Sequence, residues 1–338
     1  MKPIDLDRDT IVMPVHQIPQ YRIMASQQRK TLKNILLTTF GGIGDHICAE
    51  PTIRYASKCK SEYEIMGLAT SIPELYSHIK IDKVLTDEYV RDEWTVFKTY
   101  PDDTGLLQEF ISHGLTNCVD SSSLFAFRLQ LPTKDREIQI TPRHPGQKIA
   151  ELFDKPSVIV HAGKHWPSKT FPKAWWDDVL NEIKKSGHKP ILIGANVDGN
   201  RTSVEVETEG CIDLRNKTML SELAWVCQRA TVVLTNDSAP LHLAASTDPA
   251  DYEGTGNAWT GLIATCKHQD FITHFRKGQW QWREVAHNKG GIWETTGFLP
   301  NKDKDVHINL VEPEMLMSWL PDAREYGQWA IEKLSENK

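Results

Sequence analysis

Three short segments of the 338-residue chain combine residue types that could carry chemistry, and each follows an apolar run. The first is a glycine-rich turn formed by Gly41, Gly42, Ile43 and Gly44, with Asp45 directly after it. Glycines allow a tight turn and let a ligand approach the backbone without Cβ collisions. Asp45 would face the crevice at the carboxyl end of a strand, where it is suited to act as a general base. The alternative is that Asp45 only caps the following helix.

The second segment, residues 161–172, reads HAGKHWPSKTFP and places Lys164 and Lys169 among turn-forming residues. A lysine beside exposed backbone N–H groups suits a diphosphate, whose charge must be neutralised when it leaves. The alternative is a basic loop whose lysines are simply solvated. His161 and His165 could ligate a metal, but the segment has no acidic or cysteine partner for them, so we expect no metal site.

The third segment, residues 236–244, reads NDSAPLHLA and joins an apolar strand to a helix. A proline near the first helical position is a common helix start. The unpaired N–H groups of a helix start can bind a phosphate, and the small residues Ser238 and Ala239 would allow close approach. The alternatives are that Asp237 or Ser238 is only a cap and that His242 is a packed core histidine.

A parallel α/β sheet is predicted to position these segments, because short apolar runs alternate with amphipathic stretches. Strands are expected at 34–40, 63–68, 81–85, 137–141, 157–161, 190–194, 231–235 and 260–265. Helices are expected at 174–186, at 221–229 with Ser221 as its cap, from Pro240 onward, and in the tail after residue 312. Another helix is expected after Asp45, with Pro51 near the start of its regular part.

Composition and length indicate two domains. We predict an N-terminal extension at 1–30, domains at 31–150 and 151–311, and a helical tail at 312–338. The net charge of −6 gives no general attraction to nucleic acid or anionic membranes. Six scattered cysteines form no CxxC pair, which fits a reducing cytoplasm. No apolar run reaches the roughly 18 residues that a membrane span requires.

Taken together, the three segments resemble glycosyltransferase family 9, the ADP-heptose:lipopolysaccharide heptosyltransferases and their relatives. In that family a strand leads into a Gly-Asp turn and a helix with a proline, which is similar to residues 35–56. A His-Pro-Gly loop then runs into Trp-Pro-Ser-Lys-Arg-Trp-Pro, similar to 161–172, and Asn-Asp-Ser-Gly-Pro-Met-His-Leu-Ala follows, similar to 236–244. The order and spacing agree, and residues 213–235 are also similar to the family.

This resemblance implies an α/β fold of GT-B architecture, with two Rossmann-like parallel-sheet domains facing a central cleft and a C-terminal helix. It implies inverting, metal-independent transfer of a hexosyl, heptosyl or pentosyl group. Asp45 matches the proposed catalytic base, Lys169 matches the lysine that contacts the donor phosphate, and Lys164 is a rival for that role. Donor contacts are implied for Gly163, Lys164, Lys169, Asp198, Asp237, Ser238, Ala239 and His242.

The chain also departs from the family pattern. Ala162 replaces the usual proline, Ala239 replaces the usual glycine, and residues 247–259 and 274–293 have no counterpart in the family. Because the first of these two segments would lie near the donor sugar or acceptor, the identity of both stays open.

The expected partners are a nucleotide-diphosphate sugar as co-substrate, with no further cofactor, and a saccharide acceptor of the lipopolysaccharide-core or surface-glycan type. A lipid-linked acceptor would place the cytoplasmic protein at the inner membrane face. The alternative acceptor is a hydroxymethylated DNA base of the phage type, for which stacking rings and cations are offered by Arg276, Lys277, Trp280, Trp282 and Arg283. A third alternative is a non-catalytic nucleotide-sugar-binding protein, which the presence of Asp45 disfavours.

Overall fold

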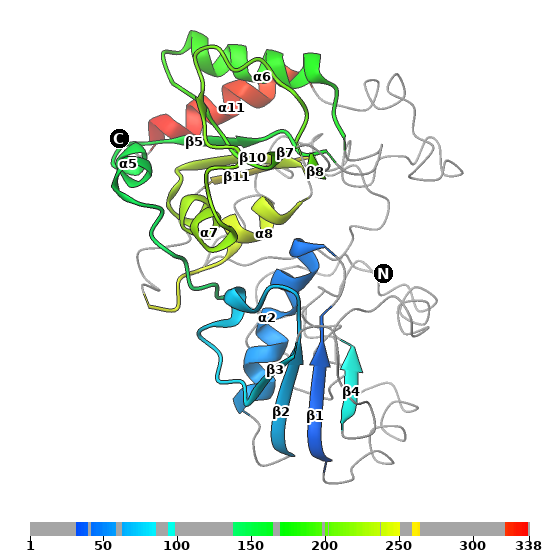
Figure 1. Ribbon diagram of the computed structural model, residues 1–338. Helices are drawn as coiled ribbons and strands as arrows, with labels where there is room; N and C mark the ends of the chain where they lie inside the picture. The colour runs from blue at the N-terminus through cyan, green and yellow to red at the C-terminus, as the bar shows by residue number, and fades with distance from the viewer. Residues whose placement is uncertain are drawn as a thin grey trace, which may run out of the picture. The chain divides into compact units, whose positions relative to one another are not determined.

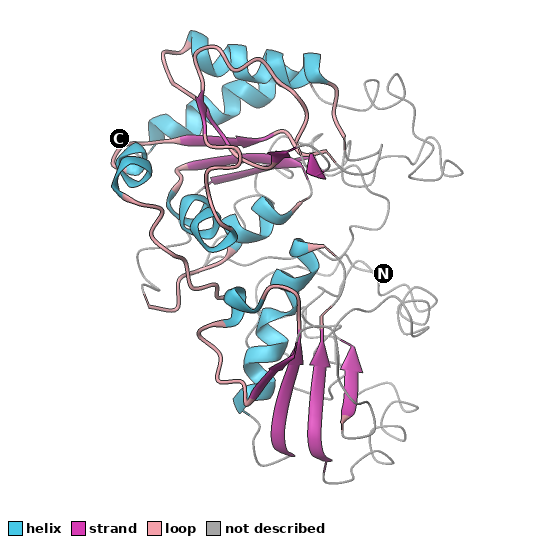
Figure 2. Ribbon diagram, viewed as in Figure 1, coloured by secondary structure: helices cyan, strands magenta, loops and turns pink. Residues whose placement is uncertain are grey.

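The computed structural model describes residues 32–39, 42–58, 63–85, 94–98, 138–164, 170–197, 200–201, 203–236, 238–250, 259–263 and 322–336. These residues form two compact units that divide between Gln139 and Ile140 (Figure 1). Each unit is a parallel sheet with helices packed on it (Figure 2). The predicted ranges for the extension, the two domains and the tail stay predictions.

The first unit contains a four-stranded sheet in the order β3-β2-β1-β4, and all its neighbouring strands are parallel. The strands are β1 (Leu32–Thr38), β2 (Tyr63–Ala69), β3 (Lys83–Leu85) and β4 (Thr95–Lys98). Residues 35–37 of β1 are buried, which fits a central parallel strand that is covered on both faces. Parallel pairing brings the carboxyl ends of β1 and β2 to one edge of the sheet.

Helix α2 (Ile43–Lys58) begins at the glycine turn after β1. The helix starts here because Gly42 and Asp45 close its first turn by hydrogen bonds. Pro51 therefore lies inside the helix, and the prediction that it would lie near the start is wrong. Its missing N–H removes one helical hydrogen bond, the one to the carbonyl of Ile47.

A buried carboxylate anchors α2 within its unit. Glu50 is fully buried and accepts hydrogen bonds from Arg54 Nε at 2.7 Å and from the backbone N–H of Gln139 at 2.8 Å. Its Oε1 also lies 3.0 Å from His78 Nε2, just after the 3-10 helix η2 (Pro73–Tyr76). A buried charge requires such partners, so Glu50 fixes α2 relative to these two segments.

The second unit contains a five-stranded parallel sheet in the order β11-β10-β5-β6-β9. Its strands are β5 (Val158–His161), β6 (Ile191–Leu192), β9 (Ile212–Asp213), β10 (Val232–Asn236) and β11 (Trp259–Ile263). Helices lie on both faces of this sheet (Figure 1). One face carries α6 (Lys173–Lys185) and α11 (Ala323–Glu336), and the other carries α7 (Leu220–Arg229) and α8 (Ala239–Ala245).

An aromatic cluster forms the core between the sheet, α6 and α11. Phe171 stacks on Trp176 with ring centroids 5.9 Å apart, and Trp175 lies 5.5 Å from Tyr326 of α11. The two helices approach closely at Gly327, where a Cβ would lie 2.9 Å from the Cβ of a glutamate on α6. The predicted tail helix is thus part of the core of the second unit.

Most predicted elements are confirmed, with ends shifted by a few residues, but some features differ. Residues 138–141 form no strand, so the prediction of a strand at 137–141 is wrong over its described part. The backbone of this segment makes a different contact, in which Ile140 donates its N–H to the carbonyl of Thr247 at 2.9 Å. β4 and β9 were not predicted, nor were the short helices α5 (Gln147–Ala150) and η5 (Glu151–Phe153) and the antiparallel pair β7 (Asn196–Val197) and β8 (Asn200–Arg201).

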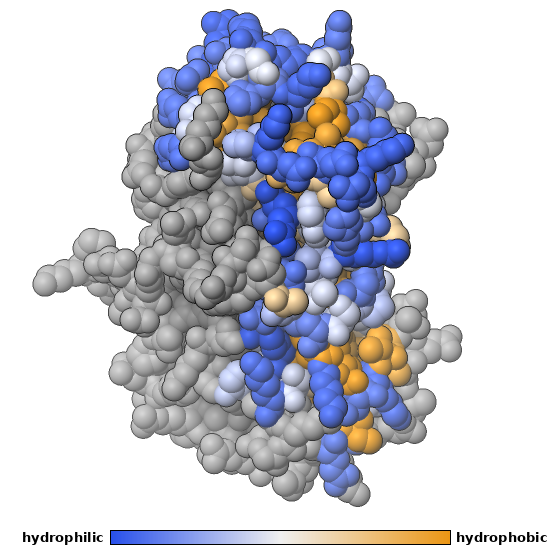
Figure 3. Space-filling view, turned by 90° about the vertical axis from the view of Figure 1, so that its left-hand side faces the viewer, coloured by the Kyte–Doolittle hydropathy of each residue, from blue (hydrophilic) through white to orange (hydrophobic). Residues whose placement is uncertain are grey.

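The described part of the surface carries few large hydrophobic side chains. Among the described residues, the exposed ones are Ile43, Val84 and Met219. On the face drawn in Figure 3, hydrophilic residues predominate among the coloured atoms, with smaller hydrophobic groups between them. Scattered apolar residues of this kind are normal on protein surfaces and need no partner to explain them.

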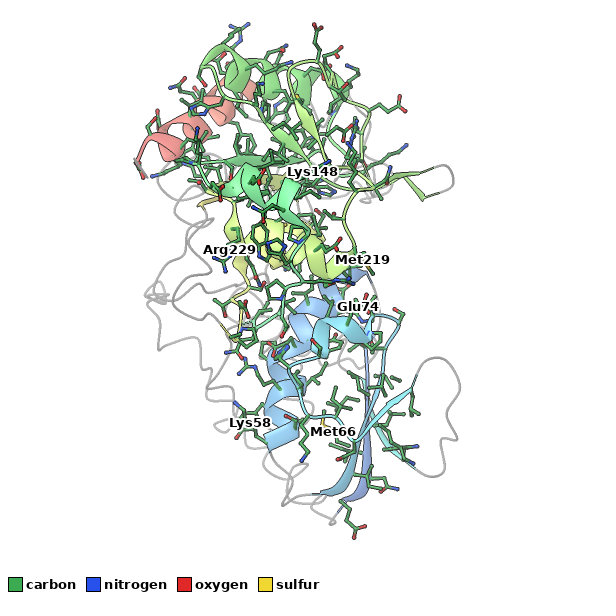
Figure 4. The ribbon with its side chains drawn as sticks, turned by 60° about the vertical axis from the view of Figure 1, so that its left-hand side comes forward. Lys58, Met66, Glu74, Lys148, Met219 and Arg229 are labelled. Carbon is green, nitrogen blue, oxygen red and sulfur yellow. The ribbon has the colours of Figure 1, made fainter. Side chains whose placement is uncertain are left out.

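The start of α7 differs from the sequence prediction. Met219, labelled in Figure 4, is the N-cap residue, and the prediction of Ser221 as the cap is wrong. The side chain of Glu222 reaches back, and its Oε2 accepts the N–H of Met219 at 2.9 Å. This bond pairs a donor at the helix start that would otherwise lack a partner within the helix.

We expect Glu222→Ala to lower the free energy of unfolding by about 0.5–2 kcal/mol, because the substitution removes this bond at the helix start. Glu222→Gln keeps an oxygen acceptor and is the matched control, with most of the stability retained. Urea unfolding followed by tryptophan fluorescence measures both. Equal losses in the two variants would contradict a capping role.

Candidate active site

Asp45 lies in the first turn of α2 and is half-buried. Its Oδ2 accepts the N–H of Gly42 at 2.7 Å, and the carbonyl of Gly42 accepts the N–H groups of Asp45 at 3.0 Å and of His46 at 3.3 Å. Asp45 therefore does cap its helix, as one interpretation of the sequence held. A carboxylate has about four lone-pair sites, and the capping bond occupies one of them.

Two glycines of this turn, Gly42 and Gly44, are among the described residues. Gly42 is exposed and Gly44 is half-buried in α2, whereas Gly41 lies outside the described residues. A Cβ added at Gly42 would lie 3.7 Å from Asp45 Oδ2, which is an ordinary contact. The capping bond itself therefore does not require glycine at this position.

His46, the residue after Asp45, is held from two sides. Its Nδ1 lies 3.1 Å from Thr70 Oγ1, just beyond β2, and its carbonyl accepts the hydroxyl of Tyr76 at 2.7 Å. Burial lowers the pKa of His46, because desolvation disfavours the charged imidazolium. These contacts fix the first turn of α2, and with it Asp45, against the end of the sheet.

In the second unit the turns after β5 and β10 are joined by an amide. Asn236 is buried, and its Nδ2 donates to the carbonyl of Gly163 at 3.0 Å. A Cβ added at Gly163 would lie 2.2 Å from Asn236 Oδ1, so only glycine allows this approach. The exposed Lys164 follows directly, and its backbone position depends on the same contact.

Ser238 is the N-cap residue of α8 and is half-buried. Its Oγ lies 3.0 Å from His161 Nδ1 and 3.2 Å from Thr235 Oγ1. The carbonyl oxygen and the Oδ1 of Asn236 both lie 3.3 Å from the same Oγ. A cluster of four side chains, which we call the β5–β10 cluster (His161, Thr235, Asn236 and Ser238), thus surrounds the start of α8.

His161 ends β5 and is buried, and desolvation lowers its pKa to about 4. Behind the ring lies Gly194, whose φ of +123° favours glycine. A Cβ there would lie 3.0 Å from His161 Cδ2 and 2.2 Å from the hydroxyl of Ser203. The imidazole is therefore neutral near pH 7 and confined between Gly194 and Ser238.

The remaining predicted site residues are placed only in part. Ala239 is the half-buried first residue of α8, and His242 is buried within the same helix. Lys169, Asp198 and Asp237 lie outside the described residues.

The sequence does not predict the contacts that His161 and Asn236 make in the second unit. Its patterns indicate His161 only as a metal ligand and Asn236 only as part of a motif. Signals for these contacts are present in the sequence. His161 and Asn236 each stand at the end of an apolar run, and Gly163 follows shortly after His161. The strand pair β7–β8 also had a signal, because the dipeptide Asp198-Gly199 between the strands is typical of hairpins.

Two kinds of feature are absent from the described residues. No group of three or more His, Cys, Asp or Glu in this part of the chain is placed to hold a metal ion. No helix in the described ranges is long and apolar enough to cross a membrane.

Known proteins resemble this chain in both sequence and fold. Residues 116–249 match the model of glycosyltransferase family 9 (heptosyltransferase). A family 9 glycosyl transferase from Veillonella parvula is similar in structure, with a TM-score of 0.53 and 13% identity over 90% of this chain and 98% of the other. The dodecameric, iron-containing heptosyltransferase TibC, solved with ADP-D-β-D-heptose, has a TM-score of 0.56 and 14% identity over 91% and 78% of the two chains. No curated protein matches the chain.

The two parallel-sheet units with a C-terminal helix are the GT-B fold of glycosyltransferases. The match over 116–249 confirms the resemblance to glycosyltransferase family 9, and the chain is accordingly a glycosyltransferase.

The buried His161 predicts sensitivity of the fold to acid. The unfolded chain binds a proton near the ordinary pKa of 6.5, whereas the folded chain does so only near 4. Stability should therefore fall as the pH drops from 6.5 to 4, by on the order of 3 kcal/mol from this residue. Urea unfolding at pH 7 and pH 4.5 measures the change.

The matched control is His161→Asn, which keeps a polar side chain that does not titrate. The difference in pH sensitivity between the two proteins isolates His161 from the carboxylates and from His46, which both proteins share. An identical pH dependence would show that His161 is already protonated, or is solvated, in the folded chain.

Proposed function

We propose that the protein transfers a sugar from a nucleotide-diphosphate donor to a hydroxyl group of a saccharide acceptor, with inversion and without a metal. The observation that carries this proposal is the β5–β10 cluster, because it lies within the residues that match family 9 and joins two turns at the carboxyl edge of a parallel sheet. Ligands of open α/β sheets bind at this edge.

The donor would bind to the second unit. Lys164 or Lys169 would neutralise the diphosphate, and Ser238 would contact it from the start of α8 beside Ala239. Donor contacts are also proposed for Gly163, Asp198, Asp237 and His242. The resemblance to the family supports all of these residues. Gly163 has further support, because the side chain of Asn236 approaches it closely and fixes the turn beside Lys164.

Asp45 would act as the general base. In this step Asp45 takes the proton of the acceptor hydroxyl while the oxygen of that hydroxyl attacks the anomeric carbon. The bond from that carbon to the diphosphate oxygen breaks at the same time, and the nucleoside diphosphate leaves with the electron pair. Because attack and departure occur on opposite faces, the configuration at the carbon inverts.

The donor sugar and nucleobase can be approached through a relative. TibC was solved with ADP-D-β-D-heptose, so ADP-linked sugars come first in a panel of candidate donors. TibC is also described as iron-containing, and for this reason metal independence needs its own test, in which turnover should persist after treatment with a chelator.

A saccharide is the proposed acceptor, and a lipid-linked one would place the cytoplasmic protein at the inner membrane face. The residues that suggested a DNA base, at 276–283, lie outside the described residues. Salt separates the two acceptors, because binding to nucleic acid weakens steeply with added salt whereas binding to a neutral glycan does not.

We expect Asp45→Asn to lower kcat by about 10²–10⁴-fold, because the amide cannot accept the proton. The amide oxygen can still accept the N–H of Gly42, so the helix start and the donor affinity should persist. Product formation from the nucleotide-sugar panel, followed by mass spectrometry, measures turnover.

Lys164→Ala and Lys169→Ala are the companion variants, and the lysine that contacts the diphosphate should show the larger loss of donor affinity.

A near-normal rate for Asp45→Asn would remove Asp45 from the mechanism. Retention of donor without any transfer by the unmodified protein would instead favour the non-catalytic binding protein.

A further inference from the structure

His46 lies at the edge of the first sheet where ligands of open α/β folds bind. The residue belongs to the first turn of α2, which follows β1, and its contact Thr70 lies just beyond β2. Because β1 and β2 are parallel, both residues are at the carboxyl edge of the sheet. His46 is buried there, and the proposed base Asp45 directly precedes it in the chain.

The hydroxyl of Thr70 has two hydrogen-bonding neighbours among the described residues. The backbone N–H of Ile72 donates to Oγ1 at 3.3 Å and uses one of its lone pairs. The Nδ1 of His46 lies 3.1 Å from the same oxygen. Thr70 is only 2% exposed, so its own proton needs an acceptor within the protein, and among these neighbours the acceptor is the imidazole nitrogen.

This requirement selects one tautomer of His46. A neutral imidazole carries one proton, on either Nδ1 or Nε2. With the proton on Nδ1, the ring would donate to Thr70, whose proton would then lack an acceptor among the described residues. With the proton on Nε2, Thr70 donates to Nδ1, and the hydroxyl is paired as both donor and acceptor. Buried polar groups are rarely left unpaired, so the Nε2–H form is favoured.

The Nε2–H group of His46 is then a donor with no partner in the part of the chain that the structure describes. The fully buried side-chain atoms that lack a partner in this part do not include Nε2, so the nitrogen keeps some contact with solvent. Since it already carries a proton, Nε2 can donate but cannot act as a base. Burial lowers the pKa of His46 and keeps the ring neutral near pH 7, which suits a neutral ligand.

The position of His46 beside Asp45 indicates which ligand this donor could meet. The Cα atoms of adjacent residues are about 3.8 Å apart, and side chains of adjacent helical residues diverge by roughly 100° because a turn takes 3.6 residues. A single atom would not contact both side chains, whereas a sugar ring with several hydroxyl groups could.

We propose that His46 binds the acceptor, and that its Nε2–H donates a hydrogen bond to a hydroxyl oxygen of the same sugar whose attacking hydroxyl faces Asp45. The proposal rests on the proposed function, in which Asp45 is the base and the acceptor is a saccharide. Thr70 is a positioning residue, because its hydroxyl occupies Nδ1 and so holds the ring in the donating form.

Two substitutions at His46 separate contact with the acceptor from support of the helix start. His46→Gln places an amide nitrogen near the position of Nε2 and keeps the donor. His46→Asn places an amide oxygen near the position of Nδ1, so it keeps the bond to Thr70 and loses the donor. The acceptor probes are the methyl glycosides of glucose, galactose and mannose, each with the sugar donor that the nucleotide-sugar panel identifies.

His46→Asn should raise the KM for the accepted glycoside by about 2–10-fold, the value of one neutral hydrogen bond. The kcat should change less, because a contact that is equal in ground state and transition state affects KM alone. His46→Gln should stay close to the unmodified protein. A histidine that only fixes the first turn of α2 would give the opposite order, with the loss in kcat of His46→Gln, and that result would overturn the proposal.

The tautomer provides a second readout, in the unmodified protein and without turnover. Long-range ¹H–¹⁵N spectra of the histidine side chains should show a neutral Nε2–H ring that is missing from the spectrum of His46→Asn. Thr70→Ser should preserve this form, whereas Thr70→Val, which lacks the hydroxyl, should populate the Nδ1–H form as well. Addition of the accepted glycoside should shift the Nε2–H proton of His46 downfield.

An Nδ1–H ring at His46 in the unmodified protein, or an Nε2–H proton that does not shift with saturating glycoside, would overturn the proposal. If no glycoside accepts a sugar from any donor of the panel, the failure belongs to the proposed function. The spectrum then still decides which nitrogen of His46 carries the proton.

Discussion

The parallel pairing of β5 with β10 is the contact on which the proposed donor site depends. The register places Thr235 opposite His161 at the carboxyl ends of the two strands. Both residues are buried there, and the chain leaves the sheet immediately afterwards in two turns. Because neighbouring parallel strands are about 4.8 Å apart, groups at these two turns can form direct hydrogen bonds. Asn236 bonds to Gly163, and Ser238 bonds to His161.

Close approach in this region is made possible by glycines. At Gly163 the amide of Asn236 occupies the place of a Cβ, and at Gly194 the hydroxyl of Ser203 and the ring of His161 do the same. Either glycine could be interpreted from sequence as a flexible turn. In the folded chain they instead allow a rigid cluster, since any side chain there would push these polar groups apart.

Each unit places a buried histidine beside the residues proposed to act. His46 follows Asp45 and meets Thr70 beyond β2, and His161 meets Ser238 beyond β10. In both cases desolvation keeps the ring neutral near pH 7, so it can hold a neighbour by hydrogen bonds without adding a charge to the site. The proposed base and the proposed donor contacts are thus supported by the same kind of neutral, buried ring.

The sequence by itself determined the class of fold and predicted where the chemistry lies. Apolar runs of strand length predicted β1, β2, β5 and β10, because a buried parallel strand is apolar on both faces. Motif order and spacing predicted the family resemblance, since three ordered segments are far more specific than any one of them. Both are local properties that can be read along the chain.

The tertiary structure alone decided which polar residues meet. His161 and Ser238 are 77 positions apart, and Asn236 and Gly163 are 73 apart. Neither pair can be read from spacing, because strand order and register set their contact. The same holds for the two helix starts. The hydrogen bond between Glu222 and Met219 sets the start of α7, and the bond between Asp45 and Gly42 sets the start of α2 and therefore the place of Pro51 within it. Local pattern fixes the elements, whereas pairing across the sheet determines which side chains can bond.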